Sequence, residues 1–180
     1  MKTFSAKELF RIIEVSQNFP LNLKFELKDL QTSINFADSI IYSILFDGNP
    51  IYIGYSFEDK QKDIRKSRWT KQLETILFRG YRVGLNLTSF KELEKSLKHK
   101  IENYYHSDIT VKKKDVMTSV NRIVFATKNW NEIKGLSSKN ETLLNRIHFQ
   151  IQDSTGLSIK KDFQDRVKEL IKQQNPRCNG

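Results

Sequence analysis

Apolar residues in the first third of the chain follow two patterns, and both predict β-strands. Residues 21–27 carry leucine or phenylalanine at every second position, which is typical of a half-buried strand. Residues 40–46 form a mainly apolar run rich in β-branched residues, and residues 51–55 resume it after the sequence Asp-Gly-Asn-Pro. Apolar runs on both sides of Asp-Gly are the strongest short-range signal of a hairpin. We therefore expect a β-hairpin over residues 40–55.

Helices are predicted where apolar residues recur three and four positions apart. This spacing occurs over about residues 59–79 and 160–173. Ser-x-x-Glu capping boxes that begin at Ser5, Ser89 and Ser138 predict three further helix starts.

A third strand is predicted at residues 120–126, which contain the sequence Ile-Val-Phe. Strand pairs mixed with helices, without regular β-α-β alternation, favour the α+β class. We expect a small antiparallel sheet of about three strands flanked by helices, in a single domain over residues 1–180. Its parts would be a core over 38–152, an N-terminal helix-and-strand extension over 1–37 and a C-terminal basic helix and tail over 153–180.

The charge of the chain points to a polyanionic partner, of which nucleic acid is the commonest. Lysine and arginine number 31 against 21 acidic residues, which gives a net charge of +10. The alternative is a basic surface that serves solubility alone. The side chains that we single out as candidate nucleic-acid contacts are Lys62, Lys66, Arg68, Trp69, Lys71, Lys160 and Lys161.

Several classes of protein are excluded by what the sequence lacks. No apolar run approaches the roughly 18 residues of a membrane helix, and the N-terminus lacks the apolar stretch of a signal peptide. The single cysteine, Cys178, excludes a disulfide framework and suits the reducing cytoplasm. The sequence has no glycine-rich phosphate loop, no HExxH zinc motif and no GxSxG elbow. We therefore expect a cytoplasmic protein without nucleotide-loop, zinc-protease or serine-hydrolase chemistry.

The predicted hairpin carries one candidate constellation. Tyr42 lies on its first strand, and the second strand carries Tyr52-Ile53-Gly54. This arrangement resembles the GIY-YIG nuclease superfamily, in which a first strand ends in tyrosine and a second reads Tyr-Ile-Gly. Ile40 stands where the family has its first glycine.

The resemblance continues downstream. In the family a helix then supplies a catalytic arginine, which Arg65 matches, with Arg68 as the alternative; Trp69 stands where the family often has histidine or tyrosine. A later strand and a helix that supplies a metal-binding glutamate would correspond to residues 120–126 and to Glu141. The asparagine that often follows the family's glutamate helix has no clear match.

The resemblance implies a phosphodiester hydrolase. Glu141 would hold Mg²⁺, or another divalent cation such as Mn²⁺, and Arg65 would clamp the scissile phosphate, as a guanidinium does well. Tyr42 would act as general base with support from Tyr52. A phenol has an ordinary pKa near 10, so this role requires nearby positive charge to lower the pKa.

By analogy with the superfamily, the resemblance implies a sequence-specific DNA endonuclease, and the length of the chain and the lack of appended modules favour its compact members. It would resemble the small restriction endonucleases or phage endonucleases of the superfamily and would act as a homodimer on double-stranded DNA. The alternatives are a non-catalytic nucleic-acid-binding protein with a degenerate GIY-YIG fold, and an interaction protein whose charge serves solubility.

Overall fold

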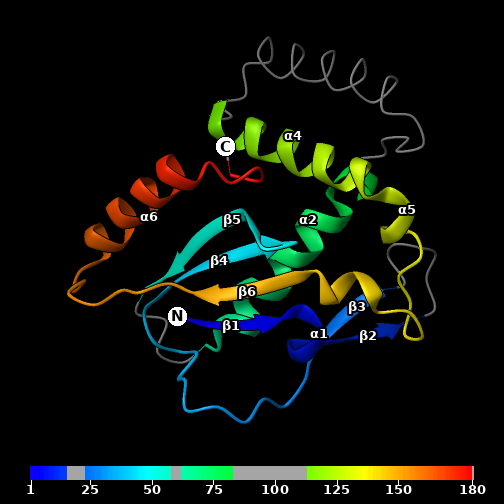
Figure 1. Ribbon diagram of the computed structural model, residues 1–180, viewed down its shortest axis with the longest axis horizontal. Helices are drawn as coiled ribbons and strands as arrows, with labels where there is room; N and C mark the ends of the chain where they lie inside the picture. The colour runs from blue at the N-terminus through cyan, green and yellow to red at the C-terminus, as the bar shows by residue number, and fades with distance from the viewer. Residues whose placement is uncertain (16–22, 58–61, 83–112, 180) are drawn as a thin grey trace.

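The computed structural model describes residues 1–15, 23–57, 62–82 and 113–179 (Figure 1). Its elements are β1 (Lys2–Ser5), α1 (Ala6–Leu9), β2 (Phe10–Glu14), β3 (Leu23–Leu27), β4 (Ile40–Phe46), β5 (Asn49–Ser56), η1 (Arg65–Trp69), α2 (Thr70–Arg82), α4 (Lys113–Lys128), α5 (Trp130–Ile133), η2 (Thr142–Asn145), β6 (Ile147–Ile151) and α6 (Lys160–Gln174). Within these described ranges, no helix combines the length and the apolar character that crossing a membrane requires.

The protein is α+β, as the sequence predicts. Its main sheet has four antiparallel strands in the order β1-β6-β4-β5, and β2 and β3 form a second, two-stranded antiparallel sheet. The main sheet has one strand more than expected because the N-terminal segment contributes β1, which pairs with β6. The N-terminal residues are therefore part of the central sheet, with the strand from residues 147–151 beside them.

The predicted hairpin is confirmed as β4 and β5. Asp47 and Gly48, which connect them, both have positive φ, at 50° and 78°. Positive φ at both central residues is the geometry of a type I′ turn, whose twist matches that of the flanking strands. β4 lies between β5 and β6 and is buried on both faces over most of its length, which explains its nearly unbroken apolar sequence.

The main sheet is covered on both faces. On one face, η1 and α2 pack against Tyr42 and Ile44 of β4, and α4 packs in turn against α2. On the other face, α6 packs against Ile41 and Ile53 (Figure 1). Ile41 is the neighbour of Tyr42 on β4, so its side chain points to the opposite face of the sheet. The α6 side chains buried in this contact are Phe163, Val167 and Leu170. The predicted C-terminal helix is thus confirmed, and it lies on the face away from Tyr42.

The strand predicted at residues 120–126 is wrong, because these residues lie inside helix α4. Ile123 and Ala126 are buried, and they recur with the spacing of one helical face. Phe125 is buried against the ring of Phe46 at the end of β4. Three consecutive apolar residues fit a buried helix as well as a strand, so this short run could not distinguish the two.

Two of the predicted capping boxes fall on described residues, and only the first forms. Ser5 caps α1, with its hydroxyl accepting from the Glu8 amide at 3.1 Å, but the chain turns into strand β2 after Leu9. Ser138 instead bonds Glu14 through its amide and hydroxyl. The helix predicted after it is only the short turn η2, followed by strand β6. The helix predicted from Ser89 lies outside the described residues.

The C-terminal tail lies along the open edge of β5. The Cys178 amide donates to the Ile51 carbonyl at 2.6 Å. The Asn179 side chain accepts from the Ile53 amide at 2.7 Å and donates to the Ile53 carbonyl at 2.9 Å. Burial raises the pKa of the Cys178 thiol to about 12, so this cysteine is a packed core residue and is not reactive at neutral pH.

Candidate functional site

The two tyrosines of the resemblance lie together on the face of the sheet covered by α2. Tyr42 pairs with Gly54 across β4 and β5, and Tyr52 lies two residues before Gly54, so all three positions share one face. The tyrosine ring centroids are 6.1 Å apart, and the two side chains share a hydrogen bond. The hairpin alone therefore brings the two phenols into contact.

Gly54 makes this contact possible because a side chain there would occupy the same space. A β-carbon built on Gly54 would lie 2.9 Å from the Tyr42 hydroxyl oxygen and 2.9 Å from a carbon of the Tyr52 ring. These distances are shorter than real β-carbon contacts, and both rings are packed in the core cluster. The Tyr-Ile-Gly sequence thus has a steric explanation: the glycine leaves room for two aromatic rings.

We expect Gly54→Ala to lower the free energy of unfolding by about 1–3 kcal/mol, the usual cost of overpacking a core. The added methyl group would push Tyr42 against Trp69, whose ring centroid lies 5.6 Å away. Urea unfolding followed by tryptophan fluorescence measures the change. Gly156→Ala is the control for glycine loss, since a β-carbon there meets nothing within 4 Å, although its φ of +81° adds backbone strain. An unchanged midpoint for Gly54→Ala would contradict the steric explanation.

Tyr42 does not have the properties of a general base in this structure. Its side chain is only 1% exposed, and burial raises the pKa of its hydroxyl well above the ordinary value. Tyr52 raises the pKa of Tyr42 further, while the positive charges of Arg68 and Arg122 only partly offset the effect. The direction is opposite to the one that the base role requires, so Tyr42 stays protonated at neutral pH and serves as a hydrogen-bond partner of Tyr52.

Two arginines act on this tyrosine pair, Arg122 through a ring contact and Arg68 through its charge. Arg68, at the end of η1, is exposed and has no carboxylate partner among the described residues, and its charge acts on Tyr42. Arg122, on α4, lies with its guanidinium carbon 5.2 Å from the Tyr52 ring centroid and donates to the Gln72 side chain at 2.9 Å. Of the two arginines that the sequence left open, Arg68 is the one whose charge affects the pKa of Tyr42.

Arg65 lies elsewhere, in a partner network of its own. Its guanidinium donates to both carboxylate oxygens of Asp63, at 2.6–3.0 Å, and sits 4.2 Å from the centroid of the Phe36 ring. The side chain is 14% exposed, and its Nη1 is buried without a partner. Burial alone would raise the pKa of Asp63, but the hydrogen bonds from Arg65 outweigh it and lower that pKa. This pair anchors the start of η1.

We expect Asp63→Asn to lower the free energy of unfolding at neutral pH by about 1–3 kcal/mol. The mostly buried guanidinium of Arg65 would then face a neutral amide, which accepts hydrogen bonds but carries no negative charge. Since the folded-state pKa of Asp63 is depressed, its contribution is complete above about pH 4 and disappears as the pH falls further. Urea unfolding at a series of pH values tests both points. Asp165→Asn, at an exposed ion pair on α6, should change little at any pH. If the stability difference between Asp63→Asn and the original protein grew as the pH fell, the role given to the Asp63–Arg65 pair would be refuted.

Trp69 is a core residue, which corrects its expected role as a nucleic-acid contact. It is 0% exposed. Its ring stacks on Phe149 at 4.8 Å and also contacts Tyr42 and Phe36. It lies in the π-helical turn η1, and its indole nitrogen is buried without a hydrogen-bond partner. Such a position cannot touch DNA unless the core opens.

Glu141 lies apart from the tyrosines and from Arg65. Its carboxylate accepts from the Ile12 amide of β2 at 3.1 Å and lies 4.0 Å from the Lys28 ammonium. Among the described residues, no hydrogen bond, ion pair or ring contact joins it to Tyr42, Tyr52 or Arg65. The side chain is 17% exposed and already has a cation beside it.

A divalent cation does not fit these residues. The Lys28 ammonium would repel a metal at Glu141, and one carboxylate oxygen is already used by a backbone amide. In the described parts of the chain, no three residues of the histidine, cysteine, aspartate and glutamate types come together as metal ligands would. The expected magnesium centre at Glu141 therefore finds no support in the geometry.

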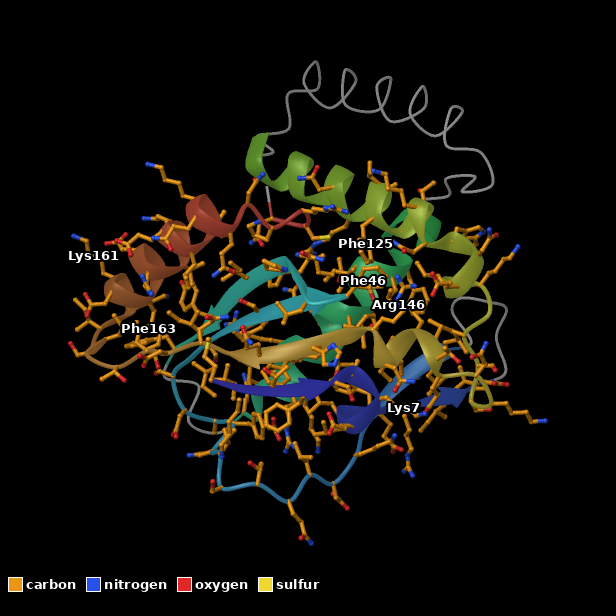
Figure 2. The ribbon with its side chains drawn as sticks, viewed as in Figure 1. Lys7, Phe46, Phe125, Arg146, Lys161 and Phe163 are labelled. Carbon is orange, nitrogen blue, oxygen red and sulfur yellow. The ribbon has the colours of Figure 1, made fainter. Side chains whose placement is uncertain are left out.

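The remaining candidate contacts are surface lysines on two sides of the molecule. Lys62, Lys66 and Lys71 are exposed before and along η1 and α2, the segment that also carries Arg68. Lys160 and Lys161 are exposed at the start of α6, which covers the opposite face of the sheet (Figure 2). The predicted basic positions therefore do not form one continuous surface.

Sequence reasoning missed three residues at the site: Gln72, Arg122 and Asn179. Gln72 and Arg122 come from two helices whose packing brings them together, and Asn179 comes from the tail. The apolar alternation of Ile147, Phe149 and Ile151 could have identified β6, and with it α6 as the helix that precedes this asparagine.

No family model, curated protein or solved structure matches this chain.

Proposed function

We propose that this protein binds DNA through its phosphodiester backbone. The contact surface is formed by Tyr52, Arg68, Gln72 and Arg122, and we call it the arginine face. The observation that carries the proposal is the Arg122 guanidinium over the ring of Tyr52, beside a buried tyrosine that the positive charge of exposed Arg68 also affects. Guanidinium groups bind phosphate oxygens two at a time and stay charged at every relevant pH.

The charge distribution around the arginine face supports this proposal. Arg68 is exposed, and none of the described carboxylates pairs with it. Lys66 and Lys71 lie close to it in the chain and are exposed too. Together with the net charge of +10, these cations would attract and hold a polyanion.

A salt series tests DNA binding. Fluorescence anisotropy with a labelled duplex should give saturable binding that weakens steeply between about 50 and 200 mM salt, because each phosphate contact releases counterions. The result that would overturn the proposal is the absence of salt-dependent affinity for duplex DNA. In that case the basic surface would serve only to keep the protein soluble.

DNA cleavage of the GIY-YIG type is the second candidate, and the element order supports it. From β4 onward the chain runs through the tyrosine hairpin, helices α2 and α4, strand β6 beside β4, and helix α6, followed by Asn179. This is the order that the resemblance implies, with β6 and α6 in place of the predicted strand and Glu141.

The carboxylates of α6 do not complete a metal site for this second candidate. Asp162 accepts from backbone amides at the start of the helix, Asp165 pairs with Lys168, and Glu169 pairs with Arg166. The buried residues that face the sheet are apolar, and Gln164, which donates to the Tyr55 hydroxyl at 3.0 Å, carries no carboxylate. We therefore rank cleavage below binding and assign no step to a metal.

Incubating plasmid DNA with the protein, with Mg²⁺ or with EDTA, separates the two candidates. Discrete fragments with Mg²⁺ alone would establish cleavage and would require a metal ligand other than Glu141. Retarded but intact DNA in both conditions is the result that binding predicts.

A further inference from the structure

A pocket lies beside the arginine face, between α4, the end of the hairpin and the C-terminal tail. Its volume is about 420 Å³, and its lining includes Asn121, Asn129, Phe46, Phe125, Asn175 and Arg177. This volume falls in the usual range of small-ligand sites, roughly 300–1,000 Å³. The lining combines amides, an apolar wall and positive charge. Figure 2 shows Phe46 and Phe125 meeting between the hairpin and α4.

The amides of the pocket are oriented by hydrogen bonds. Asn121 donates its side-chain amide to the Asn179 carbonyl at 3.1 Å, and Asn129 donates its own to the Phe125 carbonyl at 2.9 Å. The Oδ1 atoms of both residues have no partner among the described residues. They are acceptors, and a ligand with N–H₂ groups would satisfy them.

The apolar wall of the pocket is fixed in place. Phe46 and Phe125 pack edge to face, with centroids 5.0 Å apart, and the Arg146 guanidinium covers Phe46 at 4.4 Å. Arg146 is itself held by Asp47, which lowers the pKa of that carboxyl. The wall therefore offers a preformed apolar surface for the side of a flat, partly polar ligand.

The pocket adjoins the arginine face through two of its lining residues. Asn121 precedes Arg122 in α4, and the Asn179 side chain binds the backbone of Ile53, the neighbour of Tyr52. Arg177 is exposed at the rim and has no carboxylate partner among the described residues. A phosphate held at the arginine face would thus place the adjoining nucleotide near the pocket.

We infer that this pocket binds a single nucleotide and accepts the exocyclic amino group of its base. The inference rests on the proposed DNA binding for its biological setting and goes beyond it, because it assigns base recognition to a separate site. Oδ1 acceptors would favour adenine, cytosine and guanine, which carry amino groups, over thymine, which has none. Arg177 would hold the phosphate.

Titration of the full chain with each of the four deoxynucleoside monophosphates, followed by calorimetry or NMR, tests the inference. We expect saturable binding in which dTMP is about tenfold weaker than dAMP, the worth of one good hydrogen bond. Asn129→Ala should remove this difference. Arg177→Ala, at an exposed position, should weaken all four ligands alike, and Lys161→Ala on α6 should change none.

The outcomes separate the inference from the proposed function. Equal affinity for dTMP and dAMP, or no saturable binding of any monophosphate, would overturn the inference even if duplex DNA binds. Duplex DNA that fails to bind would overturn the proposed function, while nucleotide preference that depends on Asn129 would still support the pocket. Should Asn129→Ala unfold the protein, an unchanged affinity of Arg177→Ala for all four ligands would by itself overturn the inference.

Discussion

Trp69→Ala is expected to lower the free energy of unfolding by about 3–5 kcal/mol, the usual cost of deleting a large buried aromatic side chain. Trp69 is 0% exposed and packs against rings from three parts of the chain, Phe36, Tyr42 and Phe149. Its loss would leave a cavity between the main sheet and η1. Urea unfolding followed by far-ultraviolet circular dichroism measures the effect.

Trp130→Ala is the matched control, since Trp130 is only half-buried at the edge of the same cluster. It should cost clearly less. The sequence interpretation of Trp69 as a DNA contact makes the opposite prediction for Trp69→Ala, namely normal stability with weakened DNA binding. Observation of that pattern would refute the packing described for η1.

Arg68→Ala is expected to weaken duplex DNA binding about tenfold or more at low salt, because a charged hydrogen bond to phosphate is worth roughly 1.5–3 kcal/mol. Arg68 is the exposed arginine whose charge acts on the tyrosine pair. Its removal should also reduce the slope of log affinity against log salt by about 1. Anisotropy titrations at several salt concentrations measure both quantities.

Arg68→Lys keeps the charge and should restore part of the affinity, but not the two-point contact of a guanidinium. Lys161→Ala removes the same charge from the opposite side of the sheet and should have little effect. If Lys161→Ala weakens binding as much as Arg68→Ala does, DNA is held by general attraction to a basic protein. The arginine face would then have no special part in binding.

Local sequence signals predicted the elements that depend on near neighbours. The hairpin over β4 and β5 rests on Asp47 and Gly48, whose positive φ values suit their residue types. Helix α6 has a clean apolar face, and the Ser5 capping box forms as expected. These features could be predicted because the residues that determine them are within a few positions of one another.

Elements that depend on distant partners were missed. The apolar residues at 120–126 became helical because α4 packs along α2, which no local pattern shows. Strand β6 carries a local signal in its alternating apolar residues, but its place in the sheet depends on pairing with both β1 and β4. The same holds for the candidate site. The hairpin places Tyr42 and Tyr52 together as predicted. Glu141 instead contacts Ile12 and Lys28, and Arg122 lies on helix α4, where the sequence predicts a strand.

The residues that lie along the edge of β5 affect whether protein molecules associate with one another. Cys178 and Asn179 occupy hydrogen-bonding groups of Ile51 and Ile53 that would otherwise face solvent. An unpaired strand edge readily recruits a strand from another molecule. A protein without Cys178 and Asn179 would therefore expose a template for intermolecular sheet growth, so these two residues would govern whether preparations stay dispersed.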